Sequence, residues 1–189
     1  MDLLKQRILE VGVVVSDQVL KLDAILNHQV DPMLIMEMGK EFARLFADEL
    51  PEKVLTVESS GIPIALAVAY ELKVPMVFAR RKKTLTMDQD TYSERVPSFT
   101  KGIVTDIMVS SHLLKKDERI LLIDDFIANG DAARGLIRII ERAEAELVGV
   151  GIVVEKSFQA GGSSIRERGI RLESLAKIAS LANGRIEFE

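Results

Sequence analysis

The stretch from Ile120 to Ala132, ILLIDDFIANGDA, constrains the fold more than any other part of the chain. Four apolar residues lead into two adjacent acids, Asp124 and Asp125, and an Asn-Gly pair then leads into a helical pattern. We expect a strand that ends at the acids, a loop from Phe126, and a helix that begins at Asp131. In an open α/β sheet, this junction is where ligands bind.

The same stretch combines two chemical preferences. Backbone N–H groups at a helix start favour an anion, phosphate above all. Asp124 and Asp125 instead favour hydroxyl groups or a metal ion. A ribose 5-phosphate offers its phosphate to the loop and its hydroxyls to the acids. The alternative is simple turn chemistry, in which two acids end a buried strand before an Asn-Gly turn.

Near-continuous apolar segments alternate with helical patterns along most of the chain. Beside the first strand, we expect strands at 53–58, 75–80, 103–110 and 147–158, and helices at 3–11, 33–46, 62–72, 131–145 and 164–168. Asp31-Pro32 is typical of a helix start. Apolar strands that alternate with helices favour an α/β fold with a parallel sheet flanked by helices.

Composition narrows the function classes. The 189 residues predict a single domain, and 48% apolar and 29% charged residues are ordinary for a globular protein. A net charge of −4 argues against a general nucleic-acid binder. The sequence has no cysteine, no run of about 18 apolar residues and a charged N-terminus, so we expect a cytoplasmic protein without a membrane partner.

Residues 81 to about 100 interrupt the alternation, because they are polar and charged with little periodicity. A polar segment of this length inside a compact domain is usually a functional lid or a disordered loop. A surface hairpin without a function is the alternative.

The acid-containing stretch resembles the thirteen-residue motif for 5-phosphoribosyl-1-pyrophosphate (PRPP) in the type I phosphoribosyltransferases. Asn129 and Ala132 stand where most of that superfamily has Thr or Ser, and Asp131 where it often has Gly. The form ANGxAA is similar to that of the bacterial xanthine phosphoribosyltransferases. Three further stretches resemble the same family: SDQVLKLDAILNHQVDP (16–32), ESSGI (58–62) and GIVVEKSFQ (151–159).

The resemblance covers essentially the whole chain and implies a single type I phosphoribosyltransferase domain over 1–189. It implies a mobile loop at about 81–100 and a small hood formed by segments 1–30 and 159–189. The implied activity is purine salvage, in which phosphoribosyl passes from PRPP to N9 of xanthine and gives xanthosine 5′-monophosphate (XMP) and pyrophosphate. The family also implies a homodimer and Mg²⁺ held mainly through PRPP. His28 and His112 show no metal spacing.

The resemblance assigns roles to four groups of residues. The acids Asp124 and Asp125 would hold the ribose hydroxyls near the reacting carbon. The other groups are the 5-phosphate loop (Ala128, Asn129, Gly130, Asp131, Ala132), the pyrophosphate site (Ser59, Ser60, Gly61, Arg80, Arg81, Lys82, followed by Lys83) and the xanthine site (Leu20, Asn27, Lys156, Phe158). Type I members often carry a strained or cis peptide in the pyrophosphate turn, so we predict a backbone outlier within 58–61.

Each group has a structural alternative. The serines of the ESSG turn are ordinary helix caps in that alternative, and the basic run is a solvated face. Asn27-His28 would cap the following helix, and Lys156 would extend its amine to water.

Two rival functions also remain open: a purine-sensing regulator that keeps the PRPP loop, and a specificity for guanine, hypoxanthine, adenine or orotate. The regulator is disfavoured because only one helical segment precedes the PRPP-type domain.

Overall fold

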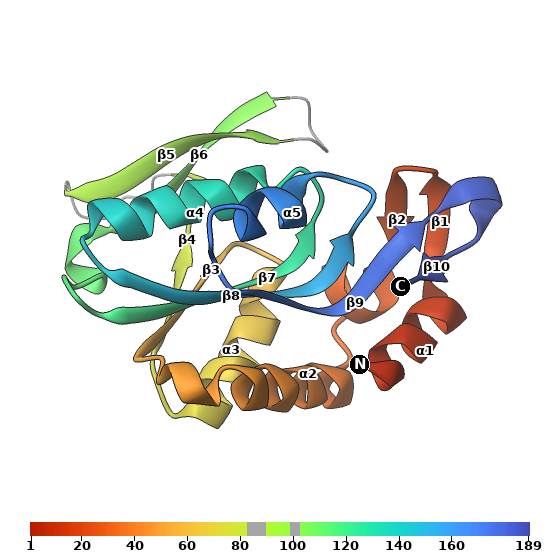
Figure 1. The fold of residues 1–189 in the computed structure, drawn as a ribbon, viewed down its shortest axis with the longest axis horizontal. Helices are drawn as coiled ribbons and strands as arrows, with labels where there is room; N and C mark the ends of the chain where they lie inside the picture. The colour runs from red at the N-terminus through yellow and green to blue at the C-terminus, as the bar shows by residue number, and fades with distance from the viewer. Residues whose placement is uncertain (83–89, 99–102) are drawn as a thin grey trace.

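A computed structural model describes residues 1–82, 90–98 and 103–189. Its central sheet has six strands in the spatial order β10 (Glu187–Phe188), β9 (Leu172–Ser180), β8 (Glu146–Lys156), β7 (Arg119–Ile127), β3 (Lys53–Val57) and β4 (Met76–Ala79). Five of these strands are parallel and β10 is antiparallel to β9 (Figure 1). The predicted parallel sheet is therefore confirmed, with one short antiparallel strand added at its edge.

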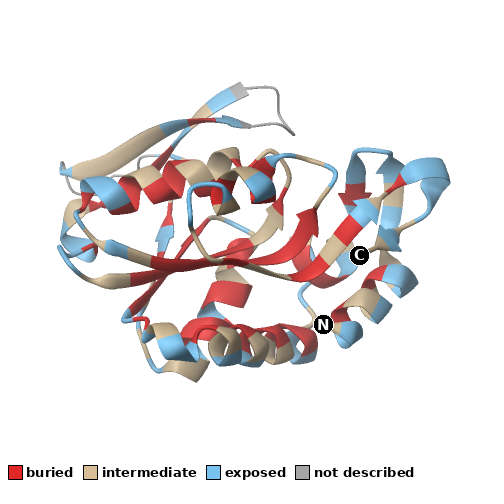
Figure 2. Ribbon diagram, viewed as in Figure 1, coloured by how far each residue is buried: buried red, intermediate tan, exposed pale blue. Residues whose placement is uncertain are grey.

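Two helices cover each face of the sheet. The helices α4 (Asp131–Arg142) and α5 (Gly161–Arg166) lie on one face, and α2 (Pro32–Leu45) and α3 (Gly61–Leu72) lie on the other (Figure 1). Successive residues of β7 alternate between the two resulting cores: Leu121 packs with the α2–α3 side and Leu122 with the α4 side. This is the period of two expected of a strand that is buried on both faces, and Figure 2 shows the sheet buried along most of its length.

β7 is longer than the sequence predicted. We expected a loop from Phe126, but Phe126 pairs with Val154 and Ile127 with Glu155 of β8. The ladder continues because Ile127 is 2% exposed and adds to the core beyond the acids. Asp124 and Asp125 therefore lie within β7, before its last two residues, rather than at the end of the strand.

The start of α2 is the predicted one. Asp31 caps the helix, since its carboxylate accepts a hydrogen bond from the backbone N of Leu34 at 3.2 Å, and Pro32 is the first helical residue.

Residues 91–98, predicted within the polar loop, instead form β5 (Thr91–Ser98), which pairs with β6 (Ile103–Ser110) in an antiparallel hairpin. The hairpin packs on α4, where a Cβ on Gly135 would lie 2.5 Å from Val96 and 2.9 Å from Ile107. Val96 is 1% exposed and is the one buried residue among 91–97, where burial is described, which is too weak a pattern to predict the strand. The mobile loop stays a prediction; residues 83–89 and 99–102, Lys83 among them, lie outside the described residues.

The N-terminal segment forms a small layer at one end of the sheet. It contains α1 (Asp2–Val11), the hairpin of β1 (Val13–Ser16) and β2 (Val19–Lys21), and a π-helical turn at Asp23–Asn27. Both chain ends lie there (Figure 1), and the amino group of Met1 donates to the carbonyl of Leu175 at 2.6 Å. Most of the 159–189 segment belongs elsewhere, because β9 joins the main sheet and α5 lies beside α4.

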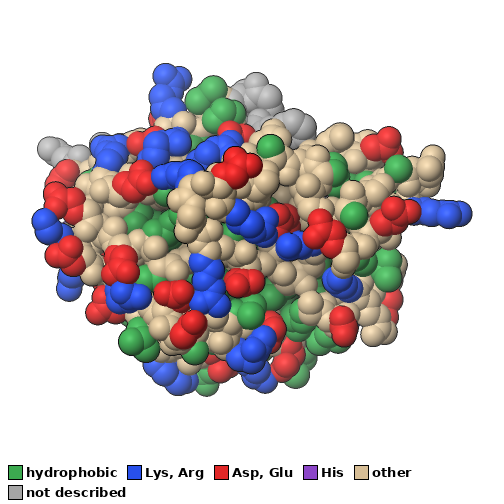
Figure 3. Space-filling model, viewed as in Figure 1, with side chains coloured by type: hydrophobic (Ala, Val, Ile, Leu, Met, Phe, Trp, Pro, Cys, Tyr) green, Lys and Arg blue, Asp and Glu red, His purple; other side chains and the backbone are tan. Residues whose placement is uncertain are grey.

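In the described parts of the chain, no helix combines the length and the apolar character needed to cross a membrane. Acidic and basic side chains are interspersed over the face shown in Figure 3.

Candidate active site

The parallel strands bring residues of three of the four sequence-predicted groups to one edge of the sheet. Because β4, β3, β7 and β8 are neighbours and run in the same direction, their carboxyl ends lie side by side. Ser59 follows β3, Arg80 follows β4, the acids lie near the end of β7, and Lys156 ends β8. The edge is the expected place for a ligand in such a sheet.

The two acids occupy a desolvated position. Asp124 is 5% exposed, and its carboxylate accepts a hydrogen bond from the backbone N of Asp125 at 3.1 Å. Burial raises the pKa of Asp124 well above its usual range, the adjacent Asp125 raises it further, and the positive charge of Arg81 acts in the opposite direction. Burial also raises the pKa of Asp125. The site therefore disfavours two bare negative charges until a cation or a hydroxyl donor compensates them.

Asn27 joins the N-terminal layer to the sheet. Its amide nitrogen donates to Asp125 Oδ2 at 3.0 Å and to Ser60 Oγ at 3.2 Å. One side chain thus links the predicted xanthine site, the acids and the predicted pyrophosphate turn. Nothing in the sequence pattern indicated this link, because the three residues lie 33 and 98 positions apart.

The turn after β3 carries the predicted backbone outlier, since the Glu58–Ser59 peptide bond is cis. Gly61 follows at the start of α3, where a Cβ would lie 2.2 Å from Thr56 Oγ1 and 2.9 Å from Asp124 Oδ1. Only glycine lets the backbone approach the acid this closely. Ser60 makes no side-chain capping bond, so the turn differs from a plain serine cap.

Glu58 holds the basic segment. Its carboxylate accepts a hydrogen bond from the backbone N of Arg81 at 2.7 Å, and its carbonyl accepts from Arg81 Nε at 3.2 Å. Arg80 Nε lies 3.8 Å from the same carboxylate. Arg81 is therefore held at the predicted pyrophosphate turn and Arg80 lies close to it, whereas Lys82 is exposed.

The predicted phosphate loop is a tight connection between β7 and α4. Gly130 is the N-cap residue of α4 and has a φ of 81°, a conformation that favours glycine. Without a side chain, it leaves the N–H groups of the first helical turn uncapped. The carbonyl of Ala128 accepts from the backbone N of Gly161 at 2.9 Å. The N–H groups of Asp131 and Ala132, in the first turn of α4, have no partner within the helix and suit an anion.

At the end of β8, Lys156 Nζ donates to the carbonyl of Gln18 at 2.6 Å and lies 5.8 Å from the centre of the Phe126 ring. Burial lowers the pKa of Lys156. Neither Gln18 nor Phe126 was singled out from the sequence. Leu20 is buried in the hydrophobic core that the N-terminal layer shares with α2, α3 and the sheet, and Phe158 is 36% exposed.

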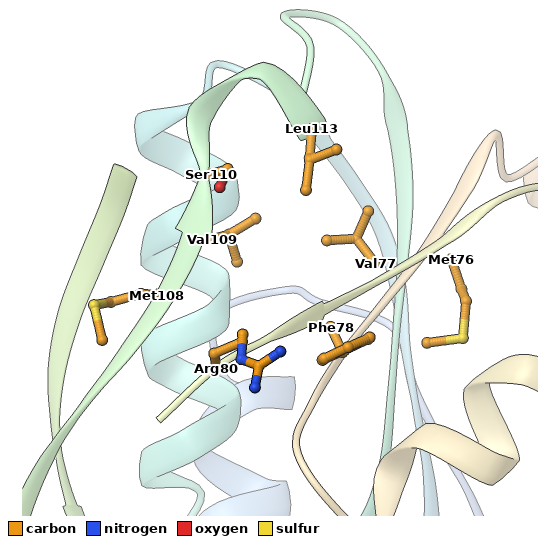
Figure 4. A pocket seen from close by; sticks show the side chains of 8 residues that line it. All are labelled: Met76, Val77, Phe78, Arg80, Met108, Val109, Ser110 and Leu113. Atoms are coloured by element: carbon orange, nitrogen blue, oxygen red, sulfur yellow. The ribbon is translucent and has the colours of Figure 1, made fainter. Parts of the chain in front are cut away.

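A separate pocket of about 230 Å³ lies on the outer side of β4, against β6 (Figure 4). Its walls are mostly apolar, and the lining residues are Met76, Val77, Phe78, Arg80, Met108, Val109, Ser110 and Leu113. Among the described residues, no group of three or more His, Cys, Asp or Glu side chains could hold a metal ion.

Comparison with known proteins gives a consistent result. Residues 22–167 match the phosphoribosyl transferase domain. The xanthine phosphoribosyltransferase of Moorella thermoacetica is 56% identical over 99% of this chain and 95% of its own length, and that of Acinetobacter baylyi is 51% identical over 98% and 97%. The crystal structure of adenine phosphoribosyltransferase from Rhodothermus marinus superposes with a TM-score of 0.74 at 25% identity, covering 94% of this chain and 97% of that one. The chain therefore belongs to the phosphoribosyl transferase family, and within it to the xanthine phosphoribosyltransferases.

Proposed function

We propose that this chain transfers the phosphoribosyl group of PRPP to N9 of xanthine and releases pyrophosphate. The product is XMP, so the reaction salvages a purine base. The observation that carries the proposal is the Asn27 amide, which donates to both Asp125 and Ser60 and so brings together the residues that we assign to xanthine, ribose and pyrophosphate. The names and the identity levels of the relatives support the same base.

In this proposal, PRPP lies along the edge of the sheet. Its 5-phosphate binds the backbone N–H groups of residues 128–132, and its ribose hydroxyls bind Asp124 and Asp125. Its pyrophosphate binds residues 59–61 with Arg80, Arg81 and Lys82. Xanthine reacts as the anion that has released its imidazole proton to water. The bond between C1 and the pyrophosphate oxygen breaks as the bond from N9 to C1 forms, pyrophosphate leaves with the bonding electron pair, and the carboxylate of Asp125 stabilises the positive charge on the sugar.

Xanthine lies between the N-terminal layer and the end of β8. Lys156 has a partly desolvated amine that donates to a base carbonyl or to the anionic form of the base. Asn27 donates to the 2-oxo group, and Phe158 stacks on the ring while Leu20 lines the site. To reach this group, the Asn27 amide gives up one of its two hydrogen bonds, to Asp125 or to Ser60. A base without a 2-oxo group offers no acceptor in exchange, and this missing bond is the basis of the discrimination.

Mg²⁺ fits this site as a companion of PRPP. The chain offers two adjacent carboxylates without a third donor among the described residues, and Mg²⁺ is commonly held by one or two carboxylates together with phosphate oxygens. When bound, the ion neutralises charge on the leaving pyrophosphate. Location in the cytoplasm stays a prediction.

The test is turnover followed by ultraviolet absorbance with Mg²⁺, PRPP and one base at a time: xanthine, guanine, hypoxanthine, adenine or orotate. We expect the highest kcat/KM for xanthine. A preference for another base would overturn the assignment of Asn27 and Lys156 but keep the PRPP site. PRPP binding without turnover of any base would favour the regulator.

We also propose that the chain forms a homodimer. Large apolar side chains are exposed on α3 and on the neighbouring edge strand: Leu66 at 59%, Tyr70 at 61% and Phe78 at 38%, the last of which lines the pocket of Figure 4. Sedimentation at micromolar concentration should give a species heavier than the 21.0 kDa chain, and a single 21.0 kDa species would contradict the dimer.

A further inference from the structure

The proposed phosphate loop contains a negative charge that opposes its function. Asp131 is the first residue of α4, in the helix turn whose N–H groups would bind the phosphate. A carboxylate there stabilises the helix itself, but it repels a phosphate dianion that binds the same N–H groups. A working phosphate site at this helix requires that the charge of Asp131 be compensated.

Arg134 provides the compensating charge. It lies three residues after Asp131, and its Nη2 donates to Asp131 Oδ1 at 2.8 Å. Its guanidinium also stands against the loop, because a Cβ on Gly130 would lie 3.0 Å from Arg134 Nη1. Both side chains are about a quarter to a third exposed, 30% for Arg134 and 26% for Asp131, so the pair is only partly screened by water.

The same guanidinium connects the loop to a second element. Arg134 Nη1 donates to Ser164 Oγ of α5 at 3.0 Å. The first residue of that helix, Gly161, in turn donates its backbone N–H to the carbonyl of Ala128 at 2.9 Å. Arg134 therefore closes a ring of contacts around the loop.

α5 is itself held against the sheet by a buried acid. Glu155 of β8 is 2% exposed and accepts two hydrogen bonds from Arg166, at 2.6 and 2.7 Å. A bidentate pair of this kind has little freedom to rotate. Ser164 is therefore on a helix that is held against β8, and the guanidinium of Arg134 bridges Ser164 and Asp131.

We propose that Arg134 is a positioning residue for PRPP: it neutralises Asp131 and holds that carboxylate away from the 5-phosphate. The inference rests on the proposed function, because it assumes that the loop binds this phosphate. It extends that function because the affinity for phosphate then depends on the Arg134–Asp131 side-chain pair as well as on the backbone N–H groups of the loop. Arg134 acts through Asp131, so removing both charges should restore what removing Arg134 alone destroys.

The experiment measures kcat and both KM values for Arg134→Met, Asp131→Asn and the double variant, together with PRPP binding by calorimetry. We expect R134M to raise the KM and Kd for PRPP about tenfold while KM for xanthine changes less than about twofold. The double variant should return to within about threefold of the wild type. Arg44→Met is the matched control, since Arg44 pairs with Glu41 at the same spacing on α2, at 2.8 Å.

Failure of the rescue would overturn the inference, because a merely structural role of Arg134 predicts that the double variant is at least as impaired as R134M. An unchanged PRPP affinity in R134M would overturn it as well. Thermal unfolding of each variant shows whether a loss comes from folding. Failure of the proposed function is distinguishable, since it would appear in the wild type as no xanthine-dependent consumption of PRPP.

Discussion

Replacing Gly61 by alanine tests whether the close approach of α3 to the acids is required. The added Cβ would lie 2.2 Å from Thr56 Oγ1 and 2.9 Å from Asp124 Oδ1. Carbon atoms essentially never come closer than 3.0 Å to such neighbours, so the turn or the acid must move by about 1 Å. Neither neighbour can yield freely, because Thr56 is fully buried and Asp124 nearly so.

The magnitude follows from these contacts. Overpacking costs about 1–3 kcal/mol, and the lower entropy of the unfolded alanine chain returns about 0.4–1 kcal/mol. The net loss is about 0–2.6 kcal/mol, which lowers Tm by up to about 10 °C in a domain of this size. A displacement of about 1 Å at the acid or the turn should lower kcat/KM for PRPP on the order of 100-fold.

The assay is steady-state turnover at saturating xanthine with varied PRPP, beside thermal unfolding by circular dichroism. Gly39→Ala is the control, because its Cβ would lie 2.6 Å from Ala67 Cβ in the packing of α2 on α3, away from the strand ends. G39A should lose similar stability and keep kcat/KM within about twofold. The reasoning is refuted if G61A keeps kcat/KM within about threefold of the wild type, or if G39A loses as much activity as G61A.

Three further predictions concern charge and metal. Asp124→Asn should abolish turnover yet unfold at a higher temperature than the wild type at neutral pH. The pKa of Asp124 is raised in the folded protein, so its ionisation costs folding stability as pH rises through the folded pKa, and the gain in Tm should vanish below about pH 3.9. An unchanged Tm at neutral pH would contradict the buried charge. Lys156→Met should lower kcat/KM for xanthine about 10- to 100-fold while PRPP binding measured by calorimetry stays near that of the wild type, and an equal loss of both would remove Lys156 from the xanthine site. Chelation by EDTA should stop turnover and added Mg²⁺ should restore it, whereas full activity in EDTA would refute the metal requirement.

Local pattern was sufficient for much of the fold. Three features are visible within short stretches of sequence, and the structure confirms each of them. They are the apolar run before Asp124, the helix start at Asp31-Pro32, and the alternation of strands with helices. The cis peptide at Glu58–Ser59 also lies where the family resemblance predicted it. The β5 strand was missed because residues 91–97 carry one buried position, Val96, which packs against Gly135 of α4.

The sequence by itself determined where most strands and helices lie, because the apolar period, the acids and the turn glycines are local signals; the end of β7 is the exception, since pairing with β8 extends it to Ile127. Only the tertiary structure decided which of those residues meet. Asn27 contacts Asp125 across 98 positions, and Lys156 contacts Gln18 across 138. The pair of Arg134 and Ser164 depends likewise on how α5 packs beside α4. Such contacts arise from packing of the whole chain, and no periodicity within one segment encodes them.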